Sequence, residues 1–326
     1  MSLQWTAMES AKNRILVTGA AGYLGSVLVP HLLGQGYHVR AVDNFIYQQT
    51  SLLPCFIHPQ FECLEGDVRD RETLKRAIED VDFIINLAAL VGAPICEQKE
   101  KEAWEINYEA VMLLDELRQP GQKYIYPNST SGYGTRSAVE GLCLEETPQE
   151  PISVYGQSKV KAEQELLQKP DVVTYRFTTV FGLSPRVRLD LMPNDFMWRA
   201  LRQGSLIIFE GSFQRSFLHI TDVARCVEFT IEHFDEMKGR CYNVGHESMN
   251  KTKKELADKI AELTGCYLHF TELREDPDKR NYSISFKRIQ DVGFFPAIGW
   301  DEGLNELYNG LKTMHWSNPC ANVEYY

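Results

Sequence analysis

The sequence predicts an α/β fold, a doubly wound parallel sheet with a smaller, mixed α/β C-terminal domain. Three observations support this prediction. Short β-branched segments alternate with longer helical segments over the first half of the chain, a glycine-rich turn follows the first of them, and the alternation stops after Gly182. Strands that alternate with helices pair in parallel through right-handed crossovers, which is the Rossmann arrangement.

The elements of the first half follow from hydrophobic periodicity. Strands are expected at 15–18, 38–42, 61–64, 83–87, 124–126 and 172–177, and helices at 22–33, 71–78, 101–117 and 154–167. Pro30 lies inside the first of these helices, where a proline should kink the helix because it lacks a backbone N–H. In the second half, 217–234 returns to a strand and a helix, and further helices are expected at 253–264 and 303–312.

These elements predict two domains behind a polar N-terminal tail, residues 1–13. The first domain comprises 14–182, and the segment 215–245 crosses back into it. The second domain comprises 183–214 and 246–326, where strands and helices are shorter and mixed. A chain of this length is consistent with about two domains.

Composition excludes several classes of partner. The 326 residues carry a formal net charge of -11, which repels polyanions, so no nucleic acid is expected to bind. No apolar segment approaches the roughly 18 residues that cross a membrane, and the N-terminus lacks the apolar block of a signal peptide. The eight cysteines are scattered without a CxxC pair, which predicts free thiols, a cytoplasmic protein and no metal site.

The glycine-rich turn predicts a dinucleotide site. Gly19, Gly22 and Gly25 lie between the first strand and the first helix, where glycine permits a tight turn and lets the backbone approach a pyrophosphate. Asp43 ends the second strand 18 residues after Gly25, close to where a carboxylate binds the adenosine ribose. No arginine or lysine follows in 44–47 to meet a 2′-phosphate, so the pattern favours NAD over NADP.

A YxxxK motif predicts an acid–base pair. Tyr155 and Lys159 share one face of a helix that begins at the carboxyl edge of the sheet, where ligands bind. A neighbouring ammonium lowers the pKa of a phenol, which is otherwise near 10. Ser129 follows the fifth strand and can offer a hydroxyl to the reacting oxygen. A second match, Tyr308 and Lys312, lies in a terminal amphipathic helix and is interpreted as structural.

Taken in order, these motifs resemble the extended short-chain dehydrogenase/reductase family, also called NAD-dependent epimerase/dehydratases. The matching segments are TGAAGYLG, VDN, GDV, NLAALVG, INYEAV, STSGYG, YGQSK, YRFTTVFG, RSFLHITDVAR and YNVGHE, which together extend from about Arg14 to Lys312. A finer resemblance in 88–96, 182–196 and 276–282 is to bacterial nucleotide-sugar 4-epimerases and GDP-heptose 4-dehydrogenase-like enzymes.

The resemblance implies NAD as the cofactor of the first domain and a GDP- or UDP-linked sugar as the substrate of the second. Expected NAD contacts are Gly19, Gly22, Tyr23, Leu24, Gly25, Asp43, Asn44, Asp67, Val68, Leu87, Ala88, Ala89, Asn107, Tyr155 and Lys159. Expected substrate contacts are Val91, Ser129, Thr130, Arg186, Asn194, Arg215 and Arg280, with Arg188 as a further candidate. The family also implies a homodimer through the helices at 101–117 and 154–167.

The predicted chemistry begins with oxidation at sugar C4. Tyr155 takes the hydroxyl proton, Ser129 holds the oxygen, and Lys159 anchors the nicotinamide ribose. The outcome stays open between a 4-epimerase and a 4-dehydrogenase in surface-polysaccharide or sugar-nucleotide metabolism. A nucleotide-sugar 4,6-dehydratase is disfavoured because Thr130 and Ser131 stand where that class carries acids. The sequence also leaves room for a non-catalytic NAD-binding Rossmann protein, for a reductase of a small carbonyl compound, and for Cys96 as an acid or base.

Overall fold

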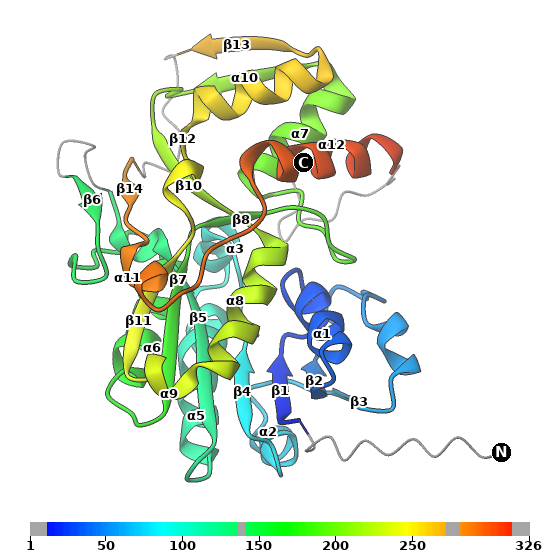
Figure 1. Ribbon diagram of the computed structural model, residues 1–326, viewed down its shortest axis with the longest axis vertical. Helices are drawn as coiled ribbons and strands as arrows, with labels where there is room; N and C mark the ends of the chain where they lie inside the picture. Colours follow the sequence, from blue (N-terminus) through cyan, green and yellow to red (C-terminus); the bar gives the residue numbers. More distant parts are fainter. Residues whose placement is uncertain (1–11, 136–140, 272–280, 315–326) are drawn as a thin grey trace.

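A computed structural model describes residues 12–135, 141–271 and 281–314 of the chain (Figure 1). Within these residues, seven parallel strands form the central sheet. Across the sheet they run β11 (Arg240–Val244), β7 (Val172–Phe177), β5 (Lys123–Ser129), β4 (Phe83–Asn86), β1 (Arg14–Thr18), β2 (His38–Asp43) and β3 (Phe61–Glu65). The doubly wound α/β fold predicted from the sequence is confirmed.

Helices cover both faces of this sheet, because successive strand residues point to opposite faces. Ile15 and Val17 of β1 pack in one apolar cluster with α1 (Gly25–Gly34) and α8 (Ile220–Glu232), whereas Leu16 packs in another. The second cluster includes α2 (Arg71–Ile78), α5 (Ala110–Leu117) and α6 (Val154–Leu166). Both faces are therefore buried, as in other parallel sheets.

A third apolar cluster lies above the carboxyl edge of the sheet (Figure 1). It joins α7 (Met192–Gln203), α10 (Lys253–Thr264) and α12 (Trp300–Thr313) to Phe181 and Phe217. Smaller sheets surround it: β8 (Thr179–Phe181) with β10 (Gln214–His219) and β12 (Asn250–Thr252), β9 (Ser205–Phe209) with β13 (Tyr267–Thr271), and β6 (Leu142–Cys143) with β14 (Ser283–Ile284). The cavity described below lies between this cluster and the central sheet.

Short helical segments complete the described chain. They are η1 (Leu53–Ile57), α3 (Ala93–Gln98), α4 (Glu100–Trp104), the π turn η2 (Glu105–Glu109), η3 (Thr130–Tyr133), α9 (Phe234–Met237), η5 (Glu247–Met249) and α11 (Lys287–Asp291). The predicted helix at 101–117 is thus continued through a π turn between α4 and α5. No helix of the described residues has the length and apolarity needed to span a bilayer.

Two local features bear on the sequence predictions: the helix α7, which was not expected, and Pro30 inside α1. The helix α7 was not predicted, because its N-cap, Leu191, offers no side-chain hydrogen bond and few of its residues are buried. Its apolar stripe is therefore too thin to stand out in the sequence. Pro30 lies on the exposed side of α1, and the helix continues for a turn beyond it to Gly34, while the expected kink stays a prediction.

Candidate active site

The glycine-rich turn after β1 is shaped by close backbone contacts. Gly19 has φ +65°, and a Cβ added there would lie 2.6 Å from the backbone nitrogen of Ala88. A Cβ on Gly25 would lie 2.3 Å from the carbonyl oxygen of Ala20. A side chain at position 19 would push the turn away from the segment that follows β4, and one at position 25 would push the start of α1 away from the turn. The turn therefore leaves a backbone cradle at the N-terminus of α1, the feature that binds a pyrophosphate in dinucleotide sites.

Asp43 at the end of β2 is held against this turn. Its carboxylate accepts hydrogen bonds from the backbone N–H groups of Ala21 at 2.9 Å and Phe45 at 2.8 Å, and from Gln49 Nε2 at 3.2 Å. Burial raises the pKa of Asp43, and these hydrogen bonds oppose the increase. Such a fixed carboxylate, facing the cavity, suits a ribose diol, as the sequence predicted.

A cavity of about 990 Å³ extends from the glycine-rich turn to α7 and β9. Its volume suits a dinucleotide with a second ligand beside it. Predicted site residues on its wall are Gly19, Gly22, Tyr23, Leu24, Gly25, Asp43, Asn44, Asp67, Val68, Leu87, Ala88, Ala89, Val91, Ser129, Tyr155, Lys159 and Arg186. These residues come from several strands and loops that are far apart in the sequence, and the structure brings them to one wall.

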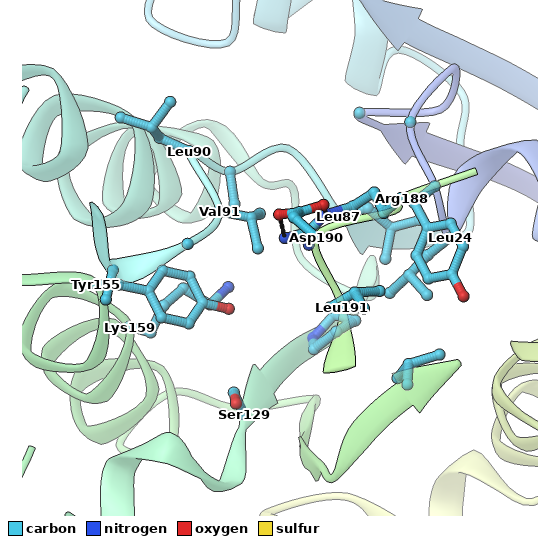
Figure 2. Close-up of a pocket in the computed structure, with 18 of the residues that line it drawn as sticks. Leu24, Leu87, Leu90, Val91, Ser129, Tyr155, Lys159, Arg188, Asp190 and Leu191 are labelled. Carbon is cyan, nitrogen blue, oxygen red and sulfur yellow. Dashed lines mark hydrogen bonds and ion pairs between the residues drawn. The ribbon is translucent and has the colours of Figure 1, made fainter. Parts of the chain in front are cut away.

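The predicted catalytic residues share one end of the cavity. Ser129 ends β5, and Tyr155 and Lys159 lie in the first turns of α6, which Ser153 caps through the backbone N–H of Gly156 at 3.1 Å. Figure 2 shows the ring of Tyr155 beside Lys159, with its phenol oxygen directed into the open space above Ser129. A ligand oxygen in that space can meet both hydroxyls, as proton transfer requires.

Lys159 is buried in a mixed apolar and aromatic environment. The ammonium nitrogen of Lys159 lies 4.0 Å from the centroid of the Tyr126 ring, and Lys159 is 4% exposed. Burial lowers the pKa of Lys159 from 10.5 to about 7, while the carboxylate of Glu163 opposes the decrease. The lysine is therefore poised to gain a proton when an acceptor, such as a ribose hydroxyl or a phenolate, lies next to it.

This pKa predicts a pH dependence of the stability of the NAD-free protein. Between about pH 7 and 10.5 the unfolded state binds more protons than the folded state at Lys159, so the free energy of unfolding rises with pH. One pKa unit corresponds to about 1.4 kcal/mol, so the whole effect amounts to a few kcal/mol. Urea unfolding of wild type and Lys159→Met measures it. The stability advantage of the variant should shrink from neutral pH to about pH 9.5; a difference that does not change with pH contradicts the prediction.

Four predicted contacts lie outside the lining of the cavity. Asn107, in the π turn, accepts from the Leu90 N–H at 2.8 Å and donates to the Leu90 carbonyl at 3.0 Å, which fixes the loop after β4. The carbonyl of Thr130 accepts from the hydroxyl of Tyr282 at 2.6 Å. Asn194 is fully buried and Arg215 is 3% exposed. Their contact with a cofactor or substrate stays a prediction, and Arg280 lies outside the described residues.

Several residues of the cavity wall were not predicted. Among them are Ile46, Tyr47, Gln49, Glu97, Glu102, Asp190, Asp195, Arg199, Ile207, Phe209 and Lys253. Most of these lie in the segment after Asp43 or within 183–214, where the sequence gave no clear strand or helix periodicity. Tyr47 is an example, since its ring lies 4.6 Å from the guanidinium of Arg186. An aromatic residue in a loop gives no signal of such a contact.

Cys96, named above as a possible acid or base, and Asn86 at the end of β4 have structural roles. Cys96 is fully buried, its thiol donates to the Leu90 carbonyl at 3.2 Å, and burial raises its pKa to about 12, which argues against a role as acid or base. Asn86 accepts from Thr18 Oγ1 at 2.6 Å and donates to the Tyr124 hydroxyl at 2.8 Å. It ties three neighbouring strands together beneath the cavity.

The described residues also lack any group of three or more His, Cys, Asp or Glu side chains that could hold a metal ion. The titratable groups of the cavity are instead spread along its length. Asp43 ends β2, Asp67 follows β3, Arg186 lies against the ring of Tyr47, and Arg188 pairs with Asp190 beside Leu24.

Comparison with known proteins adds independent findings. A sequence model of the NAD dependent epimerase/dehydratase family matches residues 15–245. UDP-N-acetyl-alpha-D-glucosaminuronate decarboxylase of Bacillus cytotoxicus is 25% identical, over 95% of this chain and 99% of its own. UDP-glucose 4-epimerase of Corynebacterium glutamicum is 25% identical, over 77% of this chain and 80% of its own. UDP-glucuronic acid 4-epimerase of Bacillus cereus, solved with UDP-glucuronic acid and NAD, superposes with a TM-score of 0.83 at 23% identity, covering 93% and 100% of the two chains.

Proposed function

Because this chain belongs to the NAD-dependent epimerase/dehydratase family, we propose that it uses NAD to oxidise C4 of a UDP-linked sugar, as a 4-epimerase. The observation that carries the proposal is the arrangement of one cavity. Tyr155, Lys159 and Ser129 lie together on its wall, and Arg186 and Arg188 line the same cavity, with Arg188 across the open space from Tyr155. A hydroxyl that reacts beside Tyr155 can belong to a molecule whose diphosphate binds to these arginines.

The glycine cradle and Asp43 fit NAD, since a Cβ would fill the first and the second offers a carboxylate to a ribose. When bound, NAD accepts hydride from the sugar carbon and can return it. Tyr155 accepts the proton of the C4 hydroxyl, and Ser129 donates a hydrogen bond to the same oxygen. Lys159 favours the phenolate of Tyr155 through its positive charge and binds ribose hydroxyls through its N–H groups.

Several features support a UDP-sugar as the substrate. The three relatives described above each carry UDP-linked sugars in their names. Arg186 is buried at the wall, and Lys253, 1% exposed, also lines the cavity and donates to the Phe209 carbonyl at 3.3 Å. Guanidinium groups suit the two phosphates, and an ammonium donor suits a base that offers carbonyl oxygens.

The dehydratase alternative lacks its acid at the expected place. Thr130 and Ser131 follow Ser129, and neither side chain can exchange protons with carbon-bound hydrogens at neutral pH. A non-catalytic NAD-binding protein would not need Tyr155 and Lys159 in the cavity, and both line it. The 4-dehydrogenase alternative shares every residue with the epimerase, so an experiment must separate the two.

A panel of UDP-, GDP- and dTDP-sugars tests the proposal. The expected result is a transient rise in NADH absorbance with one UDP-sugar and a product inverted at C4, identified by NMR. Lasting NADH with a released 4-keto sugar would instead establish a 4-dehydrogenase. Loss of the C6 oxygen would establish a dehydratase. An absence of NADH and of product with every UDP-sugar would overturn the proposal.

Three expectations from the sequence stay predictions: the homodimer, the cytoplasmic location and the division into 14–182 with 215–245 and 183–214 with 246–326. The strand β11 within 215–245 belongs to the central sheet, and α7, α10 and α12 form the third apolar cluster. These contacts support the division.

A further inference from the structure

The hydroxyl of Tyr23 joins the glycine-rich turn to a segment 159 residues away in the sequence. Tyr23 is part of the turn and lines the cavity, yet it is only 7% exposed. Its hydroxyl donates to the carbonyl oxygen of Gly182 at 2.9 Å and accepts from Asn194 Nδ2 at 3.4 Å. The turn predicted to cradle the cofactor is thus bonded to both ends of residues 183–193, which we call the arginine loop.

Asn194 closes this loop on itself. Its Oδ1 accepts from the backbone N–H of Gly182 at 3.2 Å, and its Nδ2 donates to the carbonyl of Arg188 at 2.9 Å. The side chain is fully buried, so these hydrogen bonds form without competition from water. Gly182 just before the loop, the backbone of Arg188 in its middle and Asn194 just after it therefore meet beside the hydroxyl of Tyr23.

The arginine loop carries charged side chains to the cavity. Arg188 Nη2 lies 2.6 Å from Asp190 Oδ2, and both residues line the cavity wall. Figure 2 shows this pair next to Leu24 and Val91, across the open space from Tyr155. The charge of Arg188 interacts with the phenols of Tyr155 and Tyr23. The placement of Arg188 therefore affects both the substrate side of the cavity and the residue expected to move the proton.

The hydroxyl of Tyr23 is not needed to fill space, since a phenylalanine ring has nearly the same volume. Burial raises the pKa of Tyr23 far above neutrality, so the phenol stays a neutral donor. Without it, the carbonyl of Gly182 keeps the weaker 3.4 Å contact from Asn194. The specific consequence of losing the hydroxyl is a looser connection between the turn and the arginine loop.

We infer that Tyr23 is a positioning residue, whose hydroxyl holds the arginine loop against the cofactor turn so that Arg186 and Arg188 are set for the diphosphate of the substrate. This inference rests on the proposed function. It predicts that Tyr23→Phe weakens substrate binding while NAD binding, which relies on the backbone of the turn, changes little. One neutral hydrogen bond corresponds to a change of about three- to tenfold in affinity.

The test compares NAD-loaded wild type, Tyr23→Phe and Tyr175→Phe. Tyr175 is a matched control, because its buried hydroxyl bonds to Thr230 within the central core, away from the cavity. Titration calorimetry measures the affinity of the NAD-loaded proteins for UDP and of the same proteins freed of NAD for NAD, and hydrogen–deuterium exchange reports on the amides of 183–193. Tyr23→Phe should weaken UDP about three- to tenfold, leave NAD affinity within about twofold and speed exchange in the loop. Tyr175→Phe should change none of the three.

The outcomes separate this inference from the proposed function. Unchanged UDP affinity in Tyr23→Phe overturns the inference, even if the loop exchanges faster. An equal loss of UDP affinity in Tyr175→Phe also overturns it, since the effect would then follow from lost stability. If wild type binds no UDP, the proposed function fails, and exchange in the loop still decides whether the Tyr23 hydroxyl holds it.

Discussion

Tyr155→Phe is expected to slow the reduction of bound NAD by a nucleotide sugar by about 10³-fold, because it removes the hydroxyl proposed as the proton acceptor, which lies beside Lys159 and above Ser129. Ser129 ends β5 in the same part of the cavity, but its alcohol is a much weaker acid than a phenol beside Lys159. The affinity for NAD should change by less than about threefold, since the ring of phenylalanine keeps the packing. Stopped-flow absorbance of NADH under single-turnover conditions measures the rate directly.

The chain offers a matched control for this variant. Tyr308 and Lys312 form the second YxxxK match, and their side chains hydrogen bond at 3.1 Å on α12, at an exposed site. Tyr308→Phe should leave the rate unchanged. Full activity in Tyr155→Phe would contradict the assignment of the base, and an equal loss in both variants would mean that the motif matters for stability rather than for chemistry.

Arg176→Met is expected to lower the free energy of unfolding by about 3–5 kcal/mol, because it leaves a buried carboxylate without its counter-charge. Arg176 donates from Nε and Nη2 to Glu163 Oε1 at 2.9 and 2.6 Å, and Glu163 is fully buried. Asn128 Nδ2 donates to the other oxygen of Glu163 at 2.6 Å. This network joins β7, β5 and α6 directly behind Ser129 and Lys159. Urea unfolding with a fluorescence readout measures the loss.

Two further variants test whether the unpaired charge of Glu163 causes the loss of stability in Arg176→Met. Arg71→Met removes an ion pair with Glu116 whose side chains are 45% and 62% exposed, so its cost should stay below about 1 kcal/mol. The double variant Arg176→Met/Glu163→Leu should recover a large part of the stability, because it removes the stranded charge as well. A loss in Arg176→Met no greater than that in Arg71→Met would show that Glu163 is not held as a buried anion.

Much of the site could be predicted because its requirements are local in the chain. Gly19 and Gly25 are needed where the backbone turns from strand to helix, Asp43 where the next strand ends, and Tyr155 and Lys159 one helical turn apart. Each requirement depends on neighbours within a few residues, so it appears in the sequence as a pattern of fixed spacing. The same holds for the alternation of strands and helices that predicted the sheet.

The rest depends on contacts between residues far apart in the sequence. The sequence by itself determined the parallel sheet, the glycine-rich turn and the placing of Tyr155 and Lys159 one turn apart on α6, since secondary-structure period and turn chemistry act locally. Only the tertiary structure decided that Arg186 and Arg188 line the cavity while Arg215 and Asn194 lie buried outside its lining. The hydroxyl of Tyr23 illustrates why such contacts could not be predicted. It donates to the carbonyl of Gly182, 159 residues away, because the fold packs the glycine-rich turn there, and residues so far apart share no periodic pattern in the sequence.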